Sequence, residues 1–176
     1  MCEKEFMKTI EEFIEEEELN QIDGFLNIYS NDDGSVYFLK LDEEDLNKKF
    51  IYFSYVMNAP QGSTLTGGLP SDGKVYEFRS FKKDKIGLYQ INTSYIKGDE
   101  TNNIAKSSIT NITEAFVEVF KPTAQTDNSV LINLNSIILS EKMDSISYIP
   151  SEYREYISVD YGMPDEAKTF VKNVYN

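Results

Sequence analysis

The stretch at residues 74–95, KVYEFRSFKKDKIGLYQINTSY, most constrains the fold because it has the pattern of a β-hairpin. Side chains alternate between two faces along residues 75–81, and the return run at residues 86–92 is more apolar. One face would carry Val75, Glu77, Arg79 and Phe81, and the other Tyr76, Phe78 and Ser80. The charged residues 82–85 have nothing to bury and predict the turn. We expect this hairpin at the centre of a sheet, with other strands added beside it.

Further strand-like runs occupy residues 25–29, 36–41, 50–57 and 130–134. The first two flank Asp33-Gly34, a dipeptide typical of hairpin turns. Residues 50–57 are apolar on both faces, which predicts a central strand. Together with the opening hairpin, these runs predict a mainly antiparallel sheet of about six strands.

Two stretches have helical spacing. In residues 3–20, apolar side chains recur every three or four positions at Phe6, Met7, Ile10, Phe13 and Ile14. The glutamates that end this stretch oppose the helix dipole, so we expect its last turn to fray. A second, long crossover helix is predicted at about residues 102–120, with Ile109, Ile112, Phe116, Val119 and Phe120 on its buried side. The fold class is therefore α+β, with an N-terminal acidic helix at 1–21 and a β-rich domain at 22–176.

The composition excludes several kinds of chemistry. The chain has no histidine, so a histidine-based catalytic triad, general base or zinc site is ruled out within it. Cys2 is the single cysteine, which leaves no internal disulfide and no cysteine metal cluster. With a formal charge of −13 the surface should repel nucleic acid. No segment approaches the ~18 apolar residues of a membrane span.

The longest break between predicted strands is the loop at residues 58–73, which is rich in glycine, proline and small hydroxyl side chains. Long loops in compact domains often form binding surfaces. The candidate contact residues are Gln61, Ser63, Thr64, Thr66, Gly67 and Gly68. The pair Gly67-Gly68 is followed by Leu-Pro and no helical pattern, so the loop lacks the sequence of a phosphate-binding loop.

Asn31, Asp32 and Asp33 suggest calcium, but the distal glutamate of a calcium loop is absent at the required spacing. The hairpin turn is the better interpretation. We therefore expect no metal and no cofactor. One functional hypothesis is an enzyme that uses carboxylates alone. It would need two carboxylates about 5–10 Å apart in a pocket.

The order of the segments resembles a known family. The matching stretches are residues 24–29, 36–41, 46–54, 75–79, 88–93, 116–120, 130–134 and 170–176. They resemble the non-catalytic domain of unknown function that precedes the zinc-peptidase domain of a group of large bacterial zinc-dependent metalloproteases. The resemblance covers about residues 22–176 as a series of short segments. In the glycine-rich loop this chain has Ser63 to Thr66 where family members tend to carry charged residues.

The resemblance implies a non-catalytic accessory domain, with no enzymatic activity of its own and a zinc-peptidase domain as its partner. The family's peptidase domain carries a His-Glu-x-x-His helix, and no catalytic residue transfers to a chain without histidine. The sequence ends at Asn176, just where the resemblance would continue, so we expect a domain that is truncated at its C-terminal end. Family members are exported, whereas the sequence as given predicts a cytoplasmic protein unless a signal was removed. The alternative is a stand-alone acidic binding module that uses the 58–73 loop.

Overall fold

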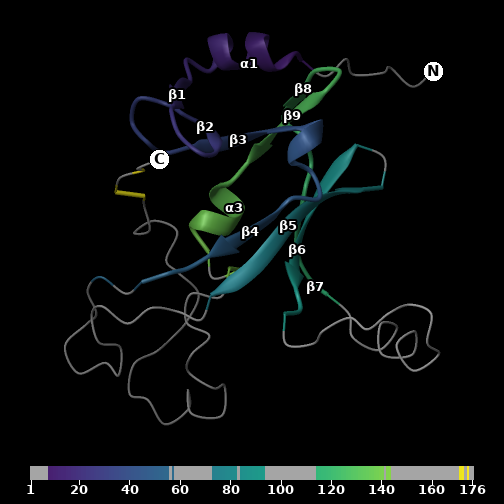
Figure 1. Ribbon diagram of the computed structural model, residues 1–176. Helices are drawn as coiled ribbons and strands as arrows, with labels where there is room; N and C mark the ends of the chain where they lie inside the picture. The colour runs from purple at the N-terminus through teal and green to yellow at the C-terminus, as the bar shows by residue number, and fades with distance from the viewer. Residues whose placement is uncertain are drawn as a thin grey trace.

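Two antiparallel sheets pack against each other, and helix α1 covers the far side of one of them (Figure 1). The computed structural model describes residues 8–55, 57, 73–82, 84–93, 114–140, 142–143, 171–172 and 174. Within these residues the expected antiparallel α+β architecture is present, but nine strands in two sheets replace the single sheet of about six strands that the sequence predicted.

Sheet A has five strands in the order β1-β2-β3-β9-β8. Their bounds are β1 Asn20–Ile22, β2 Asn27–Ser30, β3 Tyr37–Asp42, β9 Ser129–Asn133 and β8 Ala124–Gln125. The hairpin predicted around Asp33-Gly34 joins β2 to β3, and Gly34 has the positive φ of 67° that the turn requires. Asn31 Oδ1 accepts hydrogen bonds from the backbone N–H groups of Ser35 and Val36, which closes the turn.

Sheet B has four strands in the order β4-β5-β6-β7. Their bounds are β4 Lys49–Tyr52, β5 Lys74–Phe81, β6 Lys85–Ile91 and β7 Ala115–Phe120. The predicted central hairpin is confirmed, since β5 and β6 are the inner strands and pair from Val75↔Ile91 to Phe81↔Lys85. Lys82 and Asp84 have positive φ in the turn between them.

The main hydrophobic core lies between the two sheets. It consists of side chains from both sheets and from the segments that follow β9, namely Tyr37, Leu39, Leu41, Tyr76, Phe78, Ile86, Leu88, Phe120, Ile132, Leu134, Ile137 and Met143. A second, smaller core lies on the other side of sheet A, where Ile10 of α1 packs with Leu19, Phe38, Ala124 and Leu131. The alternation of faces along β3 and β9 therefore supplies both cores.

Helix α1, Ile10–Glu16, is shorter than predicted. Thr9 and Glu12 form a capping box at its start, in which each side chain accepts a hydrogen bond from the other residue's backbone N–H. The helix ends because Glu18 adopts a positive φ of 50°, which turns the chain so that Leu19 enters the smaller core. The prediction of helix up to residue 20 is therefore wrong at its end, and Asn20 begins β1. Residues 1–7 lie outside the described part of the chain.

Two predicted elements are corrected. The described part of the predicted crossover helix, Ala115–Phe120, is strand β7 and pairs with β6. Phe116, Val119 and Phe120 fit helical spacing, but β-branched and aromatic side chains also favour a strand, and pairing with β6 decides between the two. Residues 102–113 of that prediction lie outside the described chain. The run at 50–57 is not a central strand, because β4 is at the edge of sheet B.

After β9 the chain forms a short helix, α3, Asn135–Ile138. Asn135 fixes the helix against the start of β3, since its Oδ1 accepts from the Tyr37 N–H at 2.9 Å and its Nδ2 donates to the Ser35 carbonyl at 2.7 Å. One turn of 3-10 helix, Glu43–Asp45, links β3 to β4.

Candidate functional site

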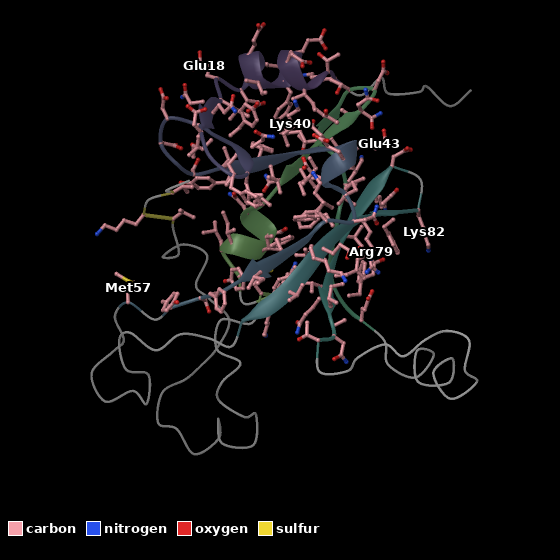
Figure 2. The ribbon with its side chains drawn as sticks, in the orientation of Figure 1. Glu18, Lys40, Glu43, Met57, Arg79 and Lys82 are labelled. Carbon is pink, nitrogen blue, oxygen red and sulfur yellow. The ribbon has the colours of Figure 1, made fainter. Side chains whose placement is uncertain are left out.

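The most distinctive surface feature is a series of exposed, large apolar side chains along β4 and the segment that continues it. Every second residue belongs to it: Ile51 is 65% exposed, Phe53 54%, Tyr55 63% and Met57 83%. Figure 2 places Met57 beyond the end of β4. We call these four residues the β4 stripe. A contiguous apolar surface on an edge strand is typical of a protein interaction site.

The β4 stripe begins next to two lysines, Lys48 and Lys49. Residues 46–57, LNKKFIYFSYVM, contain no acidic residue, although the chain as a whole has a formal charge of −13. Lys48 is paired with Asp45 at 3.2 Å, so Lys49, on the same face of β4 as Ile51, is the cation beside the stripe. Such an arrangement favours contact with a partner surface that is apolar and carries negative charge.

Phe53 lies against the backbone just before the start of β5. A Cβ added to Gly73 would lie 2.5 Å from Phe53 Cε1, so glycine is what allows the ring to sit there. Gly73 directly precedes β5 and is the last residue of the predicted 58–73 binding loop. The described end of that loop therefore touches the β4 stripe.

An ion-pair cluster lies on the same outer face of sheet B as the stripe. The two are connected by cross-strand neighbours, since Ile51 is opposite Val75 and Lys49 is opposite Glu77. Arg79 Nε donates to Glu77 Oε1 at 2.6 Å, and its Nη1 donates to Glu114 Oε2 at 2.5 Å. These two hydrogen bonds raise the pKa of Arg79 further above its already high ordinary value. The guanidinium also lies 4.9 Å from the centre of the Tyr89 ring.

Aromatic rings extend this face toward β7. Phe116 packs edge-on against Tyr89 at 5.1 Å between ring centres and contacts Phe81 at 5.3 Å. Gly87 lies beneath the Tyr89 and Phe116 rings and close to Phe81 Cβ. Phe116 is 47% exposed, so the aromatic surface remains accessible. Figure 2 labels Arg79 on sheet B, away from α1.

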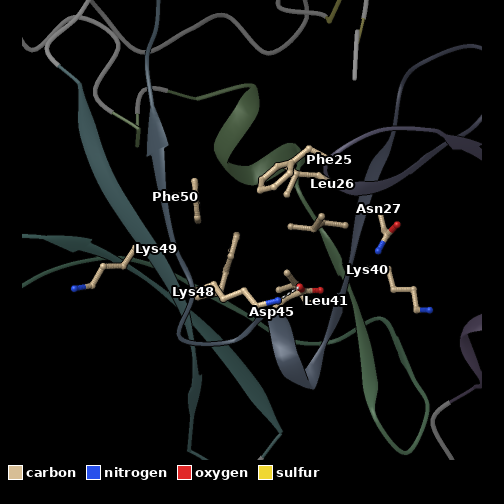
Figure 3. Close-up of a pocket in the computed structure, with 11 residues that line it drawn as sticks. Phe25, Leu26, Asn27, Lys40, Leu41, Asp45, Lys48, Lys49 and Phe50 are labelled. Atoms are coloured by element: carbon tan, nitrogen blue, oxygen red, sulfur yellow. Dashed lines mark hydrogen bonds and ion pairs between the residues drawn. The ribbon is translucent and has the colours of Figure 1, made fainter.

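A separate cavity of about 150 Å³ opens between the sheets (Figure 3). Its apolar lining comes from β3, β4 and β5 and from the segment before β2: Phe25, Leu26, Leu39, Leu41, Phe50 and Phe78. Its polar lining consists of Asn27, Lys40, Asp45, Lys48 and Lys49. A wider and more polar hollow of about 440 Å³ lies near the β5–β6 turn, with Glu43, Asp84 and Asp127 among its lining residues. The carboxylate-pair hypothesis stays a prediction for this hollow.

The predicted site residues Gln61, Ser63, Thr64, Thr66, Gly67 and Gly68 lie outside the described part of the chain. The β4 stripe was not predicted, although its signal is present in the sequence. The run at 50–57 has apolar side chains on both faces, which predicted a strand buried on both faces. In the structure, Phe50 and Tyr52 pack inward and the other face is exposed.

A comparison with protein-family models, curated proteins and solved structures finds no match to this chain. Among the described residues, no group of three or more cysteine, aspartate and glutamate side chains is arranged to hold a metal ion. No helix in the described part has the length and apolar character needed to cross a membrane.

Proposed function

We propose that this chain is a non-catalytic module that docks onto another protein domain through the β4 stripe. The single observation that supports it is the run of four large apolar side chains, each more than half exposed, at alternate positions of an edge strand and its continuation. Isolated exposed apolar residues are ordinary, but a contiguous series of this size is typical of interfaces. Aromatic anchors such as Phe53 and Tyr55 are the side chains that most often dominate binding energy.

The partner that the sequence resemblance implies is a zinc-peptidase domain. The chain has no histidine with which to form such a peptidase site itself, so any activity would belong to the partner. In this arrangement the module packs on the peptidase domain and covers part of its surface. Lys49, on the same face of β4 as the stripe, would then face acidic groups of the peptidase domain.

The test first reads the sequence encoded downstream of, or beside, this chain for a zinc-peptidase domain with a His-Glu-x-x-His motif, and then uses that domain as the partner. Calorimetry should detect binding, and the Ile51→Glu/Tyr55→Glu variant should bind at least about thirtyfold more weakly. Phe25→Ser is the matched control, because Phe25 is 88% exposed but lies outside the stripe. Equal loss in the control and the stripe variant contradicts the proposal. Hydrolysis of casein by the purified chain with zinc contradicts its non-catalytic part.

A second candidate is a stand-alone binding module that uses the 58–73 loop. The observation in its favour is that Phe53 of the stripe packs against Gly73, the last residue of the loop. Deleting residues 61–69 separates the two candidates. Binding that survives this deletion but is lost in the stripe variant favours the peptidase-docking module, and the reverse result favours the loop.

A further inference from the structure

The cavity between the sheets has an apolar interior and charged side chains at its opening. Leu39 and Leu41 of β3 are 2% and 4% exposed, and Phe78 of β5 is 6% exposed, so these side chains form a floor within the main core. Phe50 of β4 stacks on Phe78 at 5.5 Å between ring centres and closes one wall. This cavity uses the inner face of β4, whereas the β4 stripe uses the outer face.

The size of the interior limits what can enter. At about 150 Å³ the cavity has room for one benzene-sized group or a chain of about six carbons. A cavity lined by leucine and phenylalanine gains little from water and favours an apolar occupant. Phe25 at the opening is 88% exposed, which leaves an apolar ring in solvent beside the entrance (Figure 3).

One exposed lysine lies at the opening of the cavity. Of the three lysines in the lining, Lys48 alone has its ammonium group there, since Lys49 is on the outer face of β4 and Lys40 is on the α1 side of β3, where it pairs with Asp42 at 3.5 Å. Figure 3 shows Lys40 and Lys49 extending to opposite sides, while Lys48 lies at the opening and reaches Asp45.

The Lys48–Asp45 ion pair leaves the lysine available. The two groups are 3.2 Å apart, but the lysine side chain is 62% exposed and the aspartate 34%. Exposed pairs of this kind add little stability, so the ammonium group can turn to a ligand at small cost. We propose that the cavity binds a small amphiphilic carboxylate, with an apolar part of about six carbons inside and its carboxylate at Lys48.

Hexanoate is the probe, and hexylamine is its matched comparison because the chain length is the same and the charge is opposite. In a ¹H–¹³C NMR titration of the full chain, hexanoate should shift the methyl signals of Leu26, Leu39 and Leu41. It should bind about tenfold more tightly than butanoate, because two more methylenes are buried. Hexylamine should cause no saturable shift. Equal binding of hexanoate and hexylamine, or of hexanoate and butanoate, overturns the proposal.

Two variants test the two halves of the site separately. Lys48→Glu should weaken hexanoate binding at least about tenfold while leaving the weaker binding of neutral hexanol unchanged. Lys121→Glu is the control, since it makes the same charge change at an exposed residue outside the cavity. Leu26→Trp should fill the cavity and remove binding of both compounds. Hexanoate affinity that is unchanged in both Lys48→Glu and Leu26→Trp overturns the proposal.

Discussion

Arg79 and Glu77 lie two residues apart on the same face of β5, and Arg79 Nε donates to Glu77 Oε1 at 2.6 Å. Glu77 is 5% exposed, which makes it the one charged residue among the buried side chains of the described chain. A buried carboxylate needs a partner because the interior cannot replace its hydration. Arg79 is that partner, and its second contact with Glu114 joins β5 to the start of β7.

Replacing Arg79 by methionine should destabilise the fold by about 2–4 kcal/mol, because Glu77 would remain buried without its guanidinium. The value lies toward the low end for buried pairs since the Arg79 side chain is 30% exposed. Urea unfolding followed by circular dichroism measures the loss. Lys121→Met, the same change at an exposed site, should stay within about 0.5 kcal/mol of the unmodified protein.

The double variant Glu77→Gln/Arg79→Met distinguishes a lost charge partner from lost packing. Removing both charges should be less damaging than removing Arg79 alone, because no buried carboxylate is then left unpaired. A double variant that is less stable than Arg79→Met would contradict the assignment of Arg79 as the group that compensates Glu77.

Gly87→Ala should destabilise sheet B by about 1 kcal/mol. A Cβ at this position would lie 2.8 Å from Tyr89 Cε2, 3.2 Å from Phe116 Cε2 and 3.4 Å from Phe81 Cβ. Both rings would have to move, and Tyr89 is held by Arg79. In a Tyr89→Leu background the cost should shrink, since the nearest ring is gone. Equal costs in the two backgrounds, measured by urea unfolding, would show that the rings do not cause the strain.

The sequence predicts the elements whose signals are local. The β5–β6 hairpin and the Asp33-Gly34 turn were found because alternation and turn chemistry operate within a few residues. The pairing of β3 with β9 was not predictable in this way, since it joins Phe38 to Asn133 and has no local signature. The division of the strands into two sheets follows from such long-range pairs.

The errors have one physical cause. A pattern of apolar residues in the sequence does not determine which other strands or helices will cover those residues. The run at 50–57 looks like a strand buried on both faces, yet β4 is an edge strand whose second face is exposed. The run at 115–120 fits both a helix and a strand, and β6 selects the strand. The candidate site was missed for the same reason, because exposure is decided by neighbours far away in the sequence.

Alkaline pH should destabilise the fold through Tyr52. Burial raises the pKa of this phenol above 10.0, and a hydrogen bond with Ser54 only partly opposes the shift. The folded state therefore keeps the proton at a pH where the unfolded chain has lost it. The resulting stability is present in full below about pH 10 and falls as the pH rises through the folded-state pKa. Urea midpoints between pH 9 and 11 should fall more steeply for the unmodified protein than for Tyr52→Phe. The variant has the same lysines as the unmodified protein but lacks this phenol. Parallel curves would contradict the prediction.

Asn135→Ala should cost about 2 kcal/mol, because two hydrogen bonds that join α3 to the start of β3 are lost together. Asn135 Oδ1 accepts from the Tyr37 N–H and Nδ2 donates to the Ser35 carbonyl. Asn135→Asp is the sharper test, since it keeps the acceptor but sets a carboxylate against the Ser35 carbonyl. Its stability should approach that of the unmodified protein as the pH falls toward about 4, where a protonated carboxyl group can donate. Asn135→Ala has no group to titrate, so its deficit should stay constant over the same range. An Asn135→Asp deficit that is equally constant would show that the donated hydrogen bond to Ser35 contributes nothing.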